Sequence, residues 1–183
     1  LMFLFSLLTL IAILKGFWQK FIGFDAIEYD ALMESGMYKT HLLPQITRYF
    51  SIFTDAGNYG SNMGFTCVLF GITGLFSKKP GLKTYYLCVS ALSLYSMFTT
   101  GTRGAIVVPL GGLLLFALIS KNIRLMSAAT VGGICIYVFF AFTYAGESNY
   151  MIRRMRTAFR PNKDASYPVS YTHLRAHETV LDL

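Results

Sequence analysis

The sequence predicts an all-α protein, a polytopic transmembrane helix bundle of about five spanning helices with extracytoplasmic loops. Two observations on composition and one on pattern predict this class. Hydrophobic residues make up 54% of the 183 residues and charged residues only 14%, and the mean hydropathy of +0.50 is far above that of a soluble domain. The apolar residues also gather into long runs, which short polar or basic turns separate.

The apolar runs define the expected spanning helices in order. Residues 1–14 contain only Ser6 and Thr9 as polar residues, and we expect them to be the end of a spanning helix whose start is missing, in an internal fragment of a larger protein. Lys15, Trp18 and Lys20 follow, as expected where a helix leaves the hydrocarbon. The other expected spans are residues 60–76, 84–98, 105–120 and 125–144.

Residues 21–57 form the first long loop. Residues 24–37 have scattered helical periodicity, which predicts a short helix along the membrane interface, and Pro44 ends this part of the loop. We expect His41 to be a loop residue without a chemical role. Asp55-Ala-Gly-Asn58 predicts a turn and a helix start, because Asp and Asn cap free backbone amides.

The start of the 60–76 helix carries two spaced pairs. Asn58 and Asn62 fall on one helical face, and Gly60 and Gly64 form a small-xxx-small pair that lets a neighbouring helix come close. Capping and helix packing explain these residues, and a role of Asn58 in substrate binding stays open.

Charge sets the expected topology. The turns at residues 77–83 and 121–124 carry five cations and no acid, so the positive-inside rule places them in the cytoplasm. The long loop, the turn at residues 99–105 and everything after residue 144 then face outward. The arginines of segment 147–167 would prefer the cytoplasm by the same rule, but a long translocated domain escapes it. We therefore expect a large extracytoplasmic loop to begin near residue 145.

The turn Thr99-Thr100-Gly101-Thr102-Arg103-Gly104-Ala105 is the centre of the functional hypothesis. An arginine between two apolar runs is costly, so it usually holds an anion or an ion partner. Arg48, Arg153 and Arg156 are expected on the same face, and guanidiniums suit a diphosphate because they form paired hydrogen bonds. Arg48 lies just ahead of a helix N-terminus, and the two could bind phosphate jointly. For Arg153 and Arg156, an amphipathic helix on anionic headgroups is the alternative.

The cysteines and histidines of the sequence do not predict a metal site. The three cysteines stand alone in apolar segments, where a small buried thiol is the ordinary role. His173 and His177 have the spacing of a helical zinc pair, but residues 168–183 resemble a translated sequencing adapter, and we expect this tail not to be native. We expect no metal, no other cofactor and no nucleic-acid partner.

Three motifs carry a family resemblance. Thr-Gly-Thr-Arg103-Gly-Ala resembles the Ser-x-Ser-Arg-Gly-Ala pattern of the O-antigen ligase and polymerase family. The segment from Arg48 through Asn58 to Gly60 resembles that family's Arg, aromatic, Asn, Gly segment before a spanning helix. The segment from Arg153 and Arg156 to Tyr167 is similar to the start of its large extracytoplasmic loop. The resemblance covers most of residues 40–167, in matching order.

The resemblance implies an outward-facing, metal-independent glycosyl transfer in the bacterial inner membrane. A glycan on undecaprenyl diphosphate would pass to an acceptor sugar, on lipid A–core for a ligase or on another repeat unit for a polymerase. Arg48 and Arg103, and with them Asn58, Arg153 and Arg156, would bind the substrate. The family's candidate general base, a histidine, would lie beyond this fragment. Residues 1–167 would then be an inactive piece of the enzyme.

Two alternatives from other classes remain at this point. In a multi-span polysaccharide transporter or flippase, Arg103 and the asparagines would line a translocation path. In a scaffold for other subunits, Arg103 would have no role in glycan transfer.

Overall fold

The computed structural model describes residues 1–43 and 46–120, together with the single residues 127, 131, 134, 138, 142 and 156. This part of the chain is mostly helical. The elements are α1 (Met2–Phe21), α2 (Ala26–Glu34), α3 (Tyr38–His41), β1 (Leu42–Leu43), β2 (Ile46–Thr47), α4 (Ala56–Phe76), α5 (Pro80–Thr99), the 3₁₀ helix η1 (Arg103–Ile106) and α6 (Val107–Ser120). The two short strands pair antiparallel, with Leu42 opposite Thr47.

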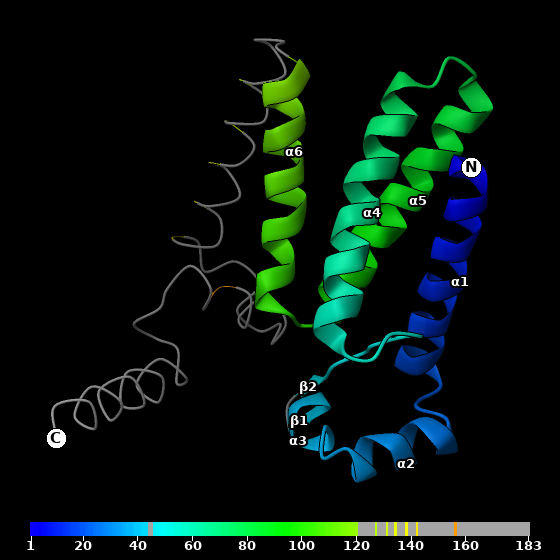
Figure 1. Cartoon of the computed structure of the whole chain (residues 1–183), viewed down its shortest axis with the longest axis vertical. Helices are drawn as coiled ribbons and strands as arrows, with labels where there is room; N and C mark the ends of the chain where they lie inside the picture. Colours follow the sequence, from blue (N-terminus) through cyan, green and yellow to red (C-terminus); the bar gives the residue numbers. More distant parts are fainter. Residues whose placement is uncertain are drawn as a thin grey trace, which may run out of the picture.

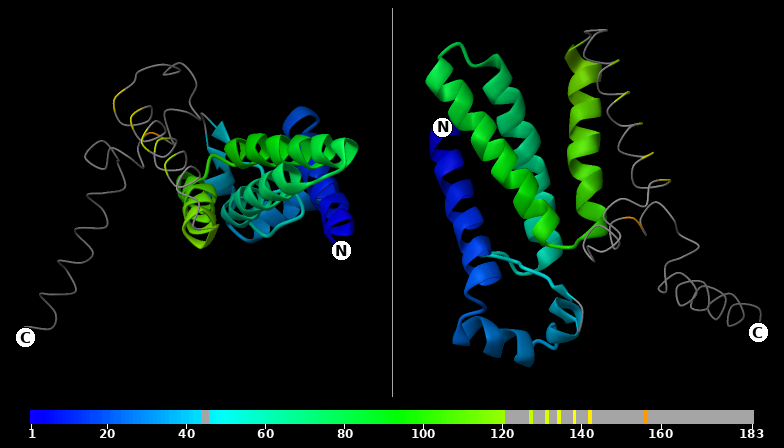
Figure 2. Two further views of the ribbon diagram at one scale, coloured as in Figure 1. Left: turned by 90° about the horizontal axis from the view of Figure 1, so that it is seen from above. Right: turned by 180° about the vertical axis from the view of Figure 1, so that it is seen from behind.

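The long helices α1, α4, α5 and α6 lie side by side, and the chain direction alternates from each to the next (Figures 1 and 2). The C-termini of α1 and α5 and the N-termini of α4 and η1 therefore share one end of the bundle, which we call the loop end. The turn between α4 and α5, with Lys78, Lys79 and Lys83, lies at the opposite end. The sequence predicted this separation of the basic turn from the turn that carries Arg103.

Small residues on α4 let its neighbours approach closely. A Cβ atom added at Gly60 would lie 2.7 Å from the Thr100 hydroxyl oxygen, and one at Gly64 would lie 3.2 Å from the Ala105 carbonyl oxygen and 3.0 Å from Cδ of Pro109. The predicted small-xxx-small contact is therefore confirmed, and it joins α4 to the turn after α5 and to the start of α6.

A buried apolar cluster near the loop end connects α1, α4, α5 and η1. It contains Ala12, Ile13, Tyr59, Met63, Met97, Ala105 and Ile106. Because the side chains of these four elements pack on one another, the turn before η1 has a fixed position relative to α1 and α4.

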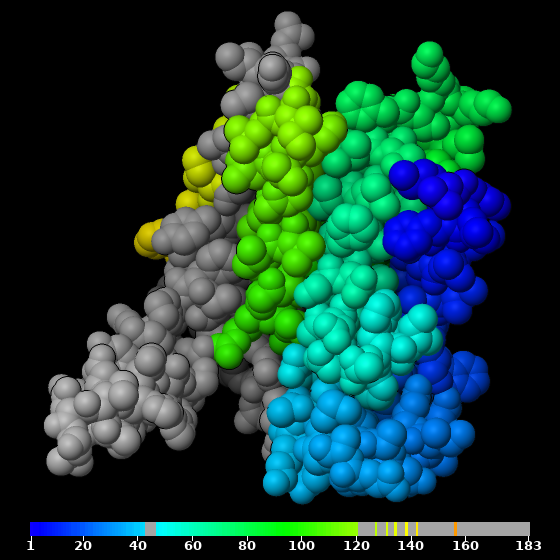
Figure 3. Space-filling model, viewed as in Figure 1, coloured from blue at the N-terminus to red at the C-terminus, as the bar shows by residue number. Residues whose placement is uncertain are grey.

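The loop between α1 and α4 folds back over the loop end. α2 lies crosswise to the bundle (Figure 1), and in the space-filling view the segment from α2 to β2 forms one continuous mass beneath α1 and α4 (Figure 3). α1 continues to Phe21, so Lys15, Trp18 and Lys20 lie within its C-terminal part, with Lys20 in the last turn. The short predicted helix is confirmed over Ala26–Glu34, within the expected 24–37. Pro44 lies outside the described residues.

The other boundaries move by a few residues for local reasons. α4 begins at Ala56 and not at residue 60, because Asp55 caps it. α5 begins at Pro80 and not at residue 84, because proline fits the first turn of a helix, where its missing N–H costs nothing.

Two of the described helical segments are long and apolar enough to cross a membrane, Met2–Phe21 and Arg103–Ser120. α4 and α5 have 21 and 20 residues, but both are richer in serine, threonine and glycine, and α5 contains Lys83. The fifth expected span, the large loop and the tail 168–183 lie outside the described residues, apart from single positions. The described part of the chain therefore supports a helical bundle with two candidate spans.

The close approach at Gly64 predicts a position-specific effect of adding a methyl group. Gly64→Ala should destabilise the protein by about 1–3 kcal/mol, because Pro109 and the Ala105 carbonyl must move apart. Gly81→Ala is the matched control, since an added Cβ there meets nothing within 4 Å, and alanine is the better helix former. Thermal unfolding in detergent should show a lower Tm for the first variant only. Equal Tm values would contradict the packing.

Candidate functional site

The turn between α5 and η1 has a defined conformation. Gly101 has a φ of +60°, a left-handed value that favours glycine. The Thr100 side chain is fully buried, and its hydroxyl donates to the Met97 carbonyl at 2.8 Å and accepts from the Thr102 amide at 3.2 Å. Arg103 follows as the first residue of η1 and is half-buried. The Gly101 conformation and the hydrogen bonds of Thr100 therefore fix the turn that precedes Arg103.

Arg48 binds this turn from the loop. Its Nε donates to the Thr100 carbonyl at 3.2 Å, and its Nη2 donates to the Thr102 hydroxyl at 2.9 Å. The two arginine motifs, which are more than fifty residues apart in sequence, thus meet at the loop end, as the sequence predicted. Arg48 also supports the turn itself, a role the sequence did not reveal.

The bonds of Arg48 belong to a closed ring of four hydrogen bonds. The Thr102 hydroxyl accepts from Arg48 and donates to the Ala56 carbonyl at 3.1 Å. The Ala56 amide donates to Nε2 of His41 at 3.2 Å, and the His41 carbonyl accepts from the Arg48 amide at 2.9 Å. We call Arg48, Thr102, Ala56 and His41 the loop-end ring. It joins the loop, the start of α4 and the turn before η1.

His41 lies at the end of α3 and is 2% exposed, so it is a buried helix residue and not the loop residue that the sequence predicted. Since Nε2 accepts from an amide, the ring proton is on Nδ1, which lies 3.1 Å from the Met37 carbonyl and donates to it. The imidazole is therefore neutral. Burial lowers the pKa of His41, and the nearby Arg48 charge lowers it further, while the Met37 hydrogen bond and Asp55 act in the opposite direction.

The free backbone amides at the N-terminus of α4 already have hydrogen-bond partners within the protein. Asp55 accepts from the amides of Gly57 at 2.5 Å and Asn58 at 3.4 Å, as the sequence predicted for a cap. His41 accepts from the Ala56 amide. Since the first three amides of the helix have protein partners, the hypothesis that Arg48 and this helix end jointly bind phosphate is wrong. An anion at the loop end must use other groups.

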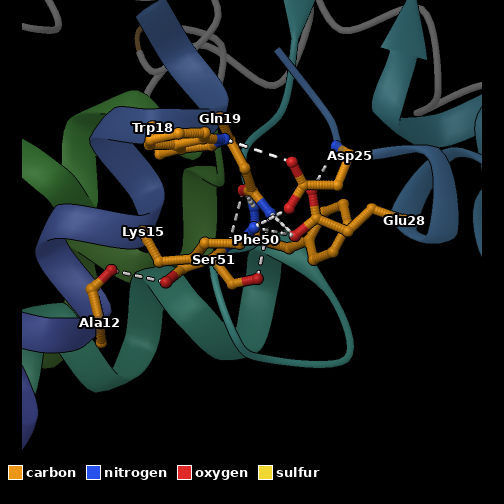
Figure 4. Close-up of polar contacts among 8 residues, drawn as sticks. All are labelled: Ala12, Lys15, Trp18, Gln19, Asp25, Glu28, Phe50 and Ser51. Carbon is orange, nitrogen blue, oxygen red and sulfur yellow. Dashed lines mark hydrogen bonds and ion pairs between the residues drawn. The ribbon is translucent and has the colours of Figure 1, made fainter. Parts of the chain in front are cut away.

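A second joint fixes the loop to α1 through Gln19, which is 2% exposed (Figure 4). Its Oε1 accepts from the amides of Phe50 and Ser51 at 3.2 and 2.7 Å, and its Nε2 donates to the Ser51 carbonyl and to Glu28, each at 3.0 Å. Ser51 has a φ of +56° and donates through its hydroxyl to the Ala12 carbonyl at 2.5 Å. These bonds hold a serine in a conformation that costs about 1–2 kcal/mol.

Lys15 and Trp18 attach α2 to α1 in the same region (Figure 4). Lys15 pairs with Asp25 and, at 2.9 Å, with Glu28, and the Trp18 indole donates to Asp25 at 3.3 Å. The hydrogen bond from Lys15 lowers the pKa of Asp25. Asp25 and Glu28 also form the capping box of α2. Lys15 and Trp18 therefore hold the start of α2 against α1, a role that the sequence did not predict.

An apolar cavity of about 360 Å³ lies between α4, α5 and the η1–α6 segment. Its lining begins beside the turn, with Phe98 and Ile106, and extends to Leu75 and Phe116 toward the opposite end. The hydroxyl of Ser90, a polar group in the lining, donates to the Cys67 carbonyl at 2.7 Å. The cavity therefore has the chemistry to accept a hydrocarbon chain.

The other predicted site residues lie as follows. Asn58 is exposed on α4 and donates to the Thr54 hydroxyl at 3.0 Å, and Asn62 donates to the Asn58 carbonyl at 2.9 Å. Arg156 is 3% exposed, whereas the headgroup interpretation expects an exposed arginine. Arg153 lies outside the described residues. The described part of the chain contains no group of three or more metal-ligating side chains.

Comparisons with protein-family models, with curated proteins and with solved structures found no match to this chain.

The loop-end ring predicts energetic coupling between Arg48 and Thr102. In a double-mutant cycle with Arg48→Ala and Thr102→Val, the free energies of unfolding should be non-additive by about 1–3 kcal/mol, because either change alone breaks the same charged hydrogen bond. Thr84, at the far end of α5, is exposed and provides the control pair. Arg48→Ala and Thr84→Val should be additive within about 0.5 kcal/mol. Additivity in both pairs would disprove the coupling.

Proposed function

We propose that the full-length protein is a membrane glycosyltransferase of the O-antigen ligase or polymerase type. It transfers a glycan from undecaprenyl diphosphate to an acceptor sugar on the outer side of the bacterial inner membrane, which it crosses several times. The acceptor is lipid A–core or another glycan repeat. The observation that carries this proposal is the bond between Arg48 and the turn of Arg103, which brings the two arginine motifs together at one end of the bundle.

The proposed chemistry needs stabilisation of a leaving group. When the glycosyl bond breaks, negative charge develops on the diphosphate, and fixed cations that already point toward that charge stabilise the transition state. In our proposal Arg103 contacts the diphosphate, while Arg48 holds the turn in place and adds a second positive charge. The general base that activates the acceptor hydroxyl lies outside the fragment.

The lipid part of the donor has a matching environment. The apolar cavity begins at Ile106, three residues after Arg103, so a hydrocarbon chain in the cavity would place its phosphates near that arginine. The alternating direction of α1, α4, α5 and α6 suits a chain that crosses the membrane with each helix (Figure 1). With residues 125–144, this gives the proposed five spans. Lys78, Lys79 and Lys83 then put the loop end outside.

The alternatives have less support. A transporter or flippase needs polar side chains along a path between helices, but Asn58 and Asn62 are exposed and bond within their own helix or to Thr54. A scaffold role makes no use of Arg103. We therefore keep the transferase as the proposal.

Arg103→Ala in the full-length protein should lower glycan transfer by about 10²–10³-fold, the effect of removing one donor that stabilises transition-state charge. Arg103→Lys should restore part of the rate, because it keeps the charge but loses the paired geometry. Transfer from a lipid-diphosphate-linked glycan in proteoliposomes measures both. Lys83→Ala, at the opposite end, is the matched control. A wild-type rate for Arg103→Ala would favour the scaffold.

Membrane sidedness gives an independent test. In a full-length variant without native cysteines, Gly104→Cys should react with an impermeant thiol reagent from outside, and Gly81→Cys only after the membrane is opened. Gly104 and Gly81 are exposed and lie at opposite ends of the bundle. Labelling of Gly104→Cys only from the cytoplasmic side would exclude transfer on the outer side.

A further inference from the structure

We propose that His41 is a positioning residue for Arg48 and the Arg103 turn, and that protonation of its ring opens this joint and switches the site off in acid. This inference rests on the proposed function for its effect on catalysis. The opening of the joint itself depends only on the geometry of the loop-end ring.

The hydrogen bonds of His41 leave no place for a second ring proton. Nε2 accepts from the Ala56 amide, and Nδ1 donates to the Met37 carbonyl. A proton on Nε2 would face the amide proton of Ala56, so the hydrogen bond that closes the ring would be lost. The first residue of α4 would then lose its partner in a buried position, which is costly.

The surroundings of the imidazole mostly oppose a positive charge. Phe50 packs edge-on against the ring, with centroids 5.4 Å apart, and the side chain is 2% exposed. Arg48 contributes positive charge from the loop, and the N-terminus of α4 contributes the positive end of its dipole. Lys39, in α3, lies over the Tyr38 ring. Asp55 is the acidic group that acts on His41 and favours protonation.

The direction of the pH effect follows from this balance. An exposed histidine titrates near pH 6.5, whereas folding lowers the pKa of His41. The stability of the joint is therefore complete above that pH and falls as the pH drops below it, because the open state binds the proton more readily. The open population should rise about tenfold for each pH unit below 6.5 until the folded state also titrates.

Opening of the joint should disturb Arg48 directly. The backbone amide of Arg48 bonds the His41 carbonyl, and the Arg48 guanidinium bonds Thr100 and Thr102. Movement of residue 41 away from Ala56 therefore releases the turn that carries Arg103. A substitution that keeps the acceptor but cannot titrate should keep the joint closed in acid.

Hydrogen exchange of the full-length protein at pH 7 and pH 5, corrected for the intrinsic pH dependence, tests the joint itself. In the wild type, amides of residues 46–58 should exchange faster at pH 5 than at pH 7, by up to about tenfold for each pH unit below 6.5. In His41→Gln, whose side-chain oxygen can accept from Ala56, the two rates should be equal. His41→Phe should exchange fast at both pH values. Equal protection of the wild type at pH 7 and pH 5 would overturn the proposal.

Glycan transfer measured on the same samples separates the two proposals. We expect the transfer rate of the wild type to fall in acid together with the opening of the joint, and that of His41→Gln to fall less. Acid-induced exchange without any glycan transfer at either pH would refute the transferase and leave the joint in place. Transfer that falls equally in the wild type and in His41→Gln would refute the switch.

Discussion

The structure depends on the contact between Arg48 and the turn that follows α5. A guanidinium donates hydrogen bonds to the Thr100 carbonyl, directly after α5, and to the Thr102 hydroxyl, directly before η1. Thr102 also bonds the Ala56 carbonyl, and the Ala56 amide bonds His41. The loop therefore cannot leave the bundle without exposing several polar groups together. Breaking one bond of the ring therefore also weakens the contacts among the loop, α4 and η1.

Two further features keep this arrangement in place. Glycines on α4 bring its backbone close to the Thr100 side chain and to Ala105, so the turn rests directly on α4. Gln19 holds Phe50 and Ser51 on α1, only two residues from Arg48. Arg48 therefore lies between two segments that are held against α4 and α1. In the proposed transferase, a side chain held in this way would lose little further entropy when an anion binds, as electrostatic catalysis requires.

The sequence predicted the features that depend on residues close together in the chain. It did not predict the hydrogen bonds between residues that are far apart in the chain. The Asp55 cap and the Gly60–Gly64 contact follow from spacing along one helix, and both were found. Of the five expected spans, two are supported in the described part of the chain as candidate membrane-spanning helices. Gln19 and His41 bond to groups that are fifteen or more residues away, so their roles could not be read locally. The sequence did offer two signals. Gln19 is a lone side-chain amide in a mostly apolar segment, and His41 is the only histidine before the tail. The ion pairs and the hydrogen bond of Lys15 and Trp18 were not predicted, because Asp25 and Glu28, at the start of α2, lie seven to thirteen residues further on.

The most direct test of this account is an experimental structure of the full-length protein in lipid nanodiscs with a bound polyprenyl diphosphate. The account predicts that Arg48 bonds the Thr100 carbonyl and the Thr102 hydroxyl, that the diphosphate contacts Arg103, and that the hydrocarbon chain enters the cavity beside Ile106. A structure in which Arg48 points into solvent, or in which the diphosphate binds at the end of the bundle with Lys78 and Lys83, would contradict it.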